Sequence, residues 1–213
     1  GSGTFIISNT GMAGTASIQY SLDVFGLAAA SGTGTLIINQ LNTAVSETVS
    51  ILGVNVSLNV PAGPYLRIDT TGTTLTVLDS EVQGNFSYEQ KTTGDGDEVV
   101  SVAATNAVVR LKQGGTTLMT LSNGIGFFIF SDDGMAGSAS GTVALNAGAV
   151  PFMTALSGTF ALAINTTDEA VAESYTLAGS SININVPEGP YLKITGDNVA
   201  FTLAIGGALG SIA

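Results

Sequence analysis

The chain has 213 residues, which is long enough for one large all-β domain or for two smaller units. Sixteen acidic residues against five Lys and Arg give a net charge of −11, which repels phosphate backbones and anionic lipid surfaces. We therefore expect no nucleic-acid partner. Only 10% of the residues are charged and 45% are hydrophobic, a composition that predicts a folded chain rather than a disordered one.

The chain contains no Cys and no His, so disulfides, thiolate or imidazole metal sites and Ser-His-Asp catalysis are excluded. Most acidic residues stand beside Gly, Asn and Thr, as in solvated turns. We expect neither an enzyme nor a bound cofactor. Membrane insertion is not expected either, because no apolar run approaches roughly 18 residues and there is no Trp for interfacial girdles. Any targeting signal lies outside this stretch.

The first elements alternate between apolar and polar residues with a period of two. Residues 4–8 are β-branched and aromatic, and the turn residues at 8–11 lead into an alternating run at 16–24. Small residues at 26–31 predict a bend, and 36–38 predict a short strand. Period two is typical of half-buried strands.

Residues 41–52 are ambiguous, because their apolar positions fit both a helical stripe and strand alternation. In a later, similar segment Val171, Glu173 and Tyr175 repeat the alternation. Thr, Val, Ser and Tyr are also better strand formers than helix formers. We predict a strand, with a short helix as the alternative.

Residues 54–60 alternate most clearly, and a rigid corner then ends the strand. Pro61, Gly63 and Pro64 form this corner, since Pro lacks a ladder donor and Gly permits the reversal. Further strands are predicted at 65–68, 73–78, 82–88, 99–104, 107–111 and 116–121. Strands at about ten-residue spacing without helices favour an antiparallel meander.

The corner occurs twice. Val60–Ile68 recurs almost letter for letter as Val186–Ile194, an offset of 186 − 60 = 126 residues, with Pro187, Gly189, Pro190 and Tyr191 at the second corner. We predict two β-repeat units, residues 1–122 and an incomplete copy at 123–213. The expected fold is all-β, a tandem repeat of antiparallel meander units forming an elongated or curled sheet that is solenoid-like or sandwich-like. It reads as a window cut from a longer array.

Three groups of residues are candidate site residues. Asp95, Asp97 and Glu98 form the densest acidic cluster and could offer oxygen ligands to Ca²⁺, although a polar hairpin tip is the simpler interpretation. Glu47 and Arg67 recur as Glu173 and Lys193, which suggests a cross-strand ion pair in each copy. Tyr65 and Tyr191 next to the corners could stack on carbohydrate, but a single aromatic more often packs over its own turn.

The repeated Ser-Gly-Thr and Leu-x-Ile-Asn blocks, the Val-Pro-x-Gly-Pro-Tyr-Leu corner and Gly-Asn-Phe-Ser-Tyr-Glu-Gln at 84–90 resemble tandem β-strand repeats of giant secreted or surface-bound bacterial proteins. The resemblance covers most of the chain but transfers no site residue. It implies an extracellular, cell-surface structural protein of adhesin or filament type. The alternative is a hydrophobe or lipid carrier with an apolar groove in a curled sheet, since residues 127–130 are apolar at every position.

The predicted partners are other copies of the chain or neighbouring repeats, joined through sheet edges. The strand equivalent to 84–90 is incomplete in the second copy, and the chain has few charges to blunt an edge. We expect self-assembly in which the C-terminal edge pairs with the N-terminal edge at Gly3–Ser8 of another copy. A head-to-tail contact of this kind propagates as a filament unless it closes into a ring.

Overall fold

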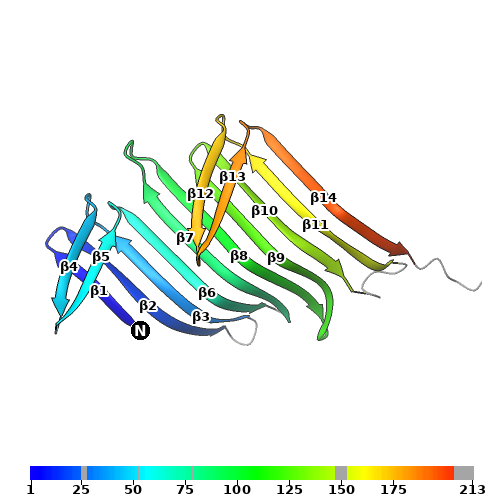
Figure 1. Cartoon of the computed structure of the whole chain (residues 1–213), viewed down its shortest axis with the longest axis horizontal. Coiled ribbons are helices and arrows are strands. Elements are labelled where there is room, and N and C mark those ends of the chain that lie inside the picture. The colour runs from blue at the N-terminus through cyan, green and yellow to red at the C-terminus, as the bar shows by residue number, and fades with distance from the viewer. Residues whose placement is uncertain (25–27, 52, 78, 147–152, 204–213) are drawn as a thin grey trace, which may run out of the picture.

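The computed structural model describes all residues except 25–27, 52, 78, 147–152 and 204–213, and every regular element within the described residues is a β-strand (Figure 1). The strands are β1 (Ser2–Ser8), β2 (Gly11–Val24), β3 (Ala28–Asn39), β4 (Val45–Ile51), β5 (Val54–Val60), β6 (Tyr65–Val77), β7 (Ser80–Thr92), β8 (Glu98–Gln113), β9 (Thr116–Ser131), β10 (Gly134–Leu145), β11 (Met153–Asn165), β12 (Val171–Leu177), β13 (Ser180–Val186) and β14 (Tyr191–Leu203). The predicted all-β class is confirmed.

Ten strands form one antiparallel sheet in the order β1-β2-β3-β6-β7-β8-β9-β10-β11-β14. Neighbouring strands follow one another along the chain except where a hairpin intervenes, so the predicted meander is confirmed. Within the described residues the sheet is open, and β1 and β14 are its two edges. The strand predicted within 41–52 is confirmed as β4, whereas part of the bend predicted at 26–31 belongs to β3.

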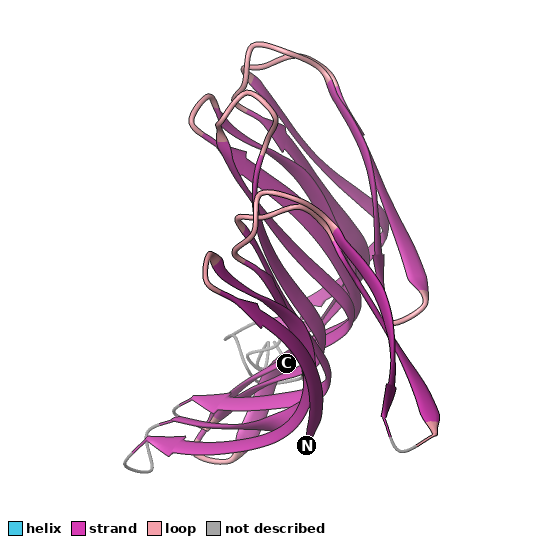
Figure 2. Cartoon of the chain, turned by 90° about the vertical axis from the view of Figure 1, so that its left-hand side faces the viewer, coloured by secondary structure: helices cyan, strands magenta, loops and turns pink. Residues whose placement is uncertain are grey.

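Two hairpins leave the meander. β4 pairs only with β5 and β12 only with β13, each as a separate two-stranded sheet that lies across one face of the large sheet (Figures 1 and 2). We call this covered side the hairpin face and the other side the open face. Because the chain steps out after β3 and returns at β6, these two strands become neighbours. Alternation predicts a strand but not its partner, so the sequence did not reveal this second layer.

Asn39 fixes the point at which the chain steps out of the sheet. Its side-chain amide donates to the carbonyls of Thr43, at 2.9 Å, and Pro61, at 2.6 Å, while its Oδ1 accepts from the amide of Leu41. A Cβ on Gly63 would stand 2.1 Å from the carbonyl oxygen of Asn39, so only glycine fits there.

The second corner repeats this arrangement. The amide of Asn165 donates to the carbonyls of Glu169 and Pro187, both at 2.7 Å, and a Cβ on Gly189 would stand 2.5 Å from the carbonyl oxygen of Asn165. Both asparagines are almost fully buried. The predicted corners are therefore asparagine-clamped exits from the sheet.

Residues in the left-handed region help to bend the sheet. The strand register shifts between β6 and β7, β7 and β8, β8 and β9, β9 and β10, and β11 and β14. Gly72, Asn106, Asn123 and Asn198 lie at such shifts with φ between 50° and 59°. Bulges of this type bend and twist the strand that carries them. Figure 2 shows the sheet strands bending together, away from the hairpins.

Each hairpin covers its own apolar core. Under the first hairpin, Val45, Leu58 and Val60 are buried against Ala13 and Tyr65. The cluster under the second hairpin contains the buried residues Ala103, Phe127, Tyr175, Leu177, Ile182 and Ile184. The second core therefore joins a hairpin of residues 171–186 to strands β8 and β9, which lie earlier in the chain.

Candidate functional site at the junction of the two copies

Arg67 on β6 lies at the centre of a polar cluster between the sheet and the second hairpin. Its Nε donates to both carboxylate oxygens of Asp69, at 2.9 and 3.0 Å, and its Nη1 is 3.5 Å from Glu89 Oε2 on β7. Its Nη2 donates to the carbonyl oxygen of Thr176 on β12 at 3.0 Å. Arg67 therefore ties β6 and β7 to the hairpin of β12 and β13.

Tyr175 on β12 completes this contact. Arg67 Cζ lies 4.9 Å from the centre of the Tyr175 ring, within the range of a cation–π interaction. The other side chain against this ring is Phe127, at 4.9 Å between centroids and 28° between planes. The Tyr175 hydroxyl is 2.7 Å from Ser87 Oγ, which donates in turn to Asp69 Oδ1. We call Arg67, Asp69, Ser87, Glu89 and Tyr175 the junction cluster.

The electrostatics keep the cluster in one charge state. Burial alone would lower the pKa of Arg67, but its hydrogen bond and charge interaction with Asp69 outweigh burial and raise the pKa above its usual range. Burial raises the pKa of Tyr175 to about 12. The pKa of Tyr65 is also raised, first by burial and then by Glu89, whose Oε2 accepts from the Tyr65 hydroxyl at 3.0 Å. The guanidinium stays charged and both phenols stay neutral at physiological pH.

This arrangement favours a structural contact between the sheet and the hairpin over a catalytic role. The guanidinium is engaged by two carboxylates, a carbonyl and an aromatic ring, so its donors are committed to protein groups. No buried side-chain nitrogen or oxygen among the described residues lacks a hydrogen-bond partner. A satisfied buried network of this type fixes one geometry between the elements it joins.

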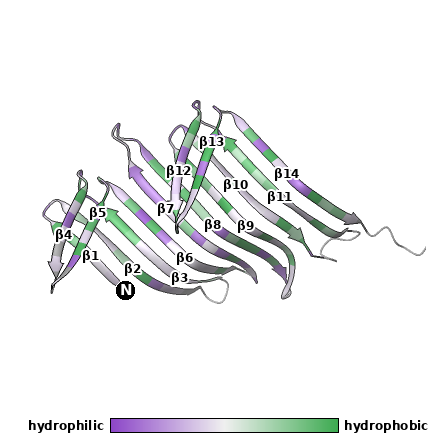
Figure 3. Ribbon diagram, in the orientation of Figure 1, coloured by the Kyte–Doolittle hydropathy of each residue, from purple (hydrophilic) through white to green (hydrophobic). Residues whose placement is uncertain are grey.

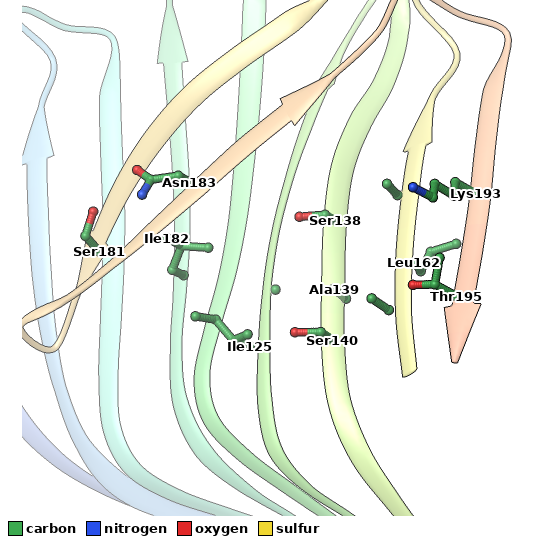
Figure 4. A pocket seen from close by; sticks show the side chains of 13 residues that line it. Ile125, Ser138, Ala139, Ser140, Leu162, Ser181, Ile182, Asn183, Lys193 and Thr195 are labelled. Atoms are coloured by element: carbon green, nitrogen blue, oxygen red, sulfur yellow. The ribbon is translucent and has the colours of Figure 1, made fainter. Parts of the chain in front are cut away.

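A cavity of about 340 Å³ that no residue of the junction cluster lines lies between β13 and strands β9, β10, β11 and β14 (Figure 4). Ser181, Ile182 and Asn183 reach it from β13, while Ser138, Ser140 and Thr195 line it from the sheet. Lys193 is the one charged residue of the lining. The wall thus combines hydroxyls with apolar side chains, the largest of which are Ile125, Leu162 and Ile182.

The predicted ion pairs are not formed. Glu47 lies opposite Leu58 and Glu173 opposite Ile184, so both glutamates belong to the hairpins rather than to strands beside β6 or β14. Arg67 pairs with Asp69 and Glu89 instead. In the part of the chain that the structure describes, Lys193 forms no ion pair. Equal offsets do not make two residues neighbours when their strands lie in different layers.

Asp95 and Asp97 of the acidic cluster lie in the exposed loop between β7 and β8, and Glu98 is the first residue of β8. Backbone bonds close this loop, since Thr93 N donates to Asp97 O at 2.8 Å and Gly96 N to Thr93 O at 3.1 Å. No group of three acidic residues in the described ranges is placed to share a metal ion. Ca²⁺ binding by Asp95, Asp97 and Glu98 stays a prediction.

The tyrosines beside the corners differ between the copies. Tyr65 is 8% exposed and packs in the first core, which leaves no face for carbohydrate, whereas Tyr191 is half-buried. Sequence reasoning did not find Asp69 and Glu89 as partners of Arg67, nor Ser87 as the partner of Asp69 and Tyr175. Of these three residues, Asp69 could have been predicted, because an Arg-x-Asp pattern on one strand places both side chains on the same face.

Comparisons with protein-family models, curated proteins and solved structures find no match for the chain. Among the described residues there is also no helix with the length and apolarity to cross a membrane.

Proposed function

We propose that the chain is a structural repeat module, and that the two copies are successive units of a tandem array. The supporting observation is the uninterrupted sheet, in which β8 of the first copy pairs with β9, the strand that carries the chain into the second copy. Equivalent hairpins, β4–β5 and β12–β13, have the same register at an offset of 126 residues, as Val45 opposite Val60 and Val171 opposite Val186 illustrate. A module of this kind acts as a stiff spacer or filament segment.

The junction cluster supports the same proposal. A spacer transmits force only if successive units are fixed relative to one another. Ser87 contacts Tyr175, 88 positions later in the chain, and Arg67 contacts Thr176, 109 positions later. Their contacts bring together the sheet of one copy and the hairpin of the next. The residues that best carry the proposed function are therefore at the junction rather than in a pocket.

Propagation beyond one chain uses the sheet edges. β1 is an edge strand, as predicted for Gly3–Ser8, and β14 is the opposite edge. The C-terminal strand equivalent to 84–90 lies outside the described residues. Edge strands expose unpaired N–H and C=O groups, which another strand can satisfy. We place the array outside a bacterial cell, as a surface, adhesin or filament protein, on the resemblance of its repeated phrases.

Electron microscopy and light scattering across a concentration series test this proposal. The expected result is elongated assemblies that grow with concentration. Thr4→Pro and Phe5→Pro are the informative variants. Of two consecutive residues in an edge strand, one directs its N–H away from β2, and Pro at that position prevents hydrogen bonding to a strand of another copy. At least one of the two should remain folded by circular dichroism and stop growth. Assemblies that are absent at all concentrations, or unaffected by both variants, contradict edge pairing.

A further inference from the structure

The open face of the sheet is apolar along its whole width. Thirteen large hydrophobic side chains are exposed in the described residues, with exposed fractions from 36% for Tyr88 to 80% for Ile7. The strand register places all of them on the open face: Phe5, Ile7, Ile18, Ile68, Val77, Tyr88, Val102, Leu111, Phe130, Leu192, Ile194, Val199 and Phe201. In Figure 3, green and purple or white segments alternate along β6 and β14, as two different faces require.

One row of register partners shows this continuity. Leu36 pairs with Ile68, Ile68 with Tyr88, Tyr88 with Val102 and Val102 with Phe128, so five adjacent strands contribute neighbouring apolar side chains. The row continues through Gly137, Ile164 and Leu192 to the far edge. Apolar patches of this extent mark interaction sites.

Charge is segregated to the hairpin face. Among strand residues of the large sheet whose side chains the structure describes, the charged ones on the hairpin face are Arg67, Asp69, Glu81, Glu89, Lys91, Arg110, Lys112, Lys193 and Asp197. Glu98, the first residue of β8, is the one charged residue among them that the register places on the open face. Covering the open face therefore costs almost no desolvation of charge.

We propose that a second copy of the chain covers this surface, so that two sheets pack with their open faces together. The exposed parts of the thirteen side chains amount to on the order of 1,000 Å², against about 800 Å² per partner in a standard stable interface. Two packed sheets with apolar inner faces and polar outer faces form a β-sandwich. The hairpin faces of both copies then point to solvent.

The duplication makes the open face self-complementary. Leu66 and Ile68 on β6 recur as Leu192 and Ile194 on β14, so each half of the face presents the same apolar pattern. A two-fold axis that lies in the plane between the two sheets therefore places apolar surface against apolar surface. A membrane surface is less favoured, because the face has no Lys or Arg among its described side chains to contact anionic lipid.

This inference goes beyond edge pairing, because it uses a face that edge contacts leave uncovered, and it holds whether or not the chain forms filaments. Sedimentation equilibrium over a concentration series measures it. The test variant is Ile18→Lys with Ile68→Lys, two open-face positions on the interior strands β2 and β6, at 47% and 40% exposure. The control is Gln19→Lys with Thr71→Lys, exposed hairpin-face positions on the same strands, which add the same charge.

We expect the unmodified chain and the control to associate face to face, and the open-face variant to dissociate at least 10-fold more readily while its circular dichroism is unchanged. Thr4→Pro and Phe5→Pro should leave the face-to-face dimer intact. A strictly monomeric unmodified chain overturns the inference. If both proline variants lose the association and the open-face variant keeps it, the inference is also overturned, and the sheet edges are then the contact between copies. A monomer that takes up a fluorescent fatty acid stoichiometrically overturns it in favour of a hydrophobe carrier.

Discussion

The two hairpins have the same backbone register, yet they are buried to different extents. At their bases the burial is equal, since Leu58 and Val60 of the first are as inaccessible as Ile184 and Val186 of the second. Further from the corner, Ile182 is 5% exposed whereas its equivalent, Val56, is only half-buried. The second hairpin contacts strands β7 to β11, whereas the first, near the edge of the sheet, contacts β2 and β3. A hairpin's burial thus depends on the strands that precede its own copy.

The corners, which the two hairpins share, should give the largest effect. We expect Gly63→Ala and Gly189→Ala to cost about 3 kcal/mol or more each, because the new Cβ would overlap a backbone carbonyl oxygen at 2.1 and 2.5 Å. Gly94→Ala, with nothing within 4 Å, is the control and should be nearly neutral. Urea denaturation measures all three. A neutral effect at either corner would mean that the backbone path there is different.

The next largest effect should come from the difference in burial between the two hairpins. Ile182→Ala empties a buried site and should cost about 2–4 kcal/mol, whereas Val56→Ala at the half-buried equivalent should cost about 1 kcal/mol. Thermal unfolding of the two variants side by side measures this ratio. Equal losses would show that the first hairpin is as firmly seated as the second.

Alkaline pH should weaken the packing of the second hairpin on the sheet. The pKa of Tyr175 rises on folding from 10.0 to about 12, so the folded state holds its proton more tightly. Its stabilising contribution is complete below about pH 10 and is lost as the pH rises toward 12, by about 2–3 kcal/mol in total. Tyr175→Phe should flatten this part of the stability profile. The first hairpin has Val49 at the equivalent position, and its core instead holds Tyr65, whose pKa is raised by burial and by Glu89 and which contributes with the same sign at higher pH. A profile unchanged by Tyr175→Phe would assign the titration to another group.

The smallest contrast concerns Arg67 and its equivalent Lys193. Arg67→Ala should cost about 1–3 kcal/mol, because Asp69 and Glu89 lose their partner next to a buried ring. Lys193 is exposed, so Lys193→Ala should change stability by no more than about 0.5 kcal/mol. Urea titrations at low and high salt distinguish the two. Equal costs would mean that Arg67 acts only as a surface charge.

Local signals in the sequence predicted the local structure well. Alternation at 54–60 and turn residues at 8–11 act over a few residues, so the strands and the Pro-Gly-Pro corners could be predicted. The second layer could not, because a strand's pattern does not name its partner. Tyr175 and Ser87 are 88 residues apart, and only the crossing of β12 over β7 brings them together.

The bend was also hidden in the sequence. Asn106, Asn123 and Asn198 have no special status in their strands until their left-handed φ values are seen. The exposed apolar face could not be predicted for a different reason. Alternation shows that a strand has an apolar side, but not whether another layer of the same chain covers it.

The central claim is that the second hairpin is fixed to the sheet of the first copy, and a double-mutant cycle on Ser87→Ala and Tyr175→Phe tests it most directly. The two hydroxyls are 2.7 Å apart and buried, one in each copy. The account predicts a coupling free energy of about 0.5–1.5 kcal/mol between the two substitutions. Additive effects, with coupling below about 0.3 kcal/mol, would contradict it, because a hairpin that is not seated on β7 leaves the two side chains independent.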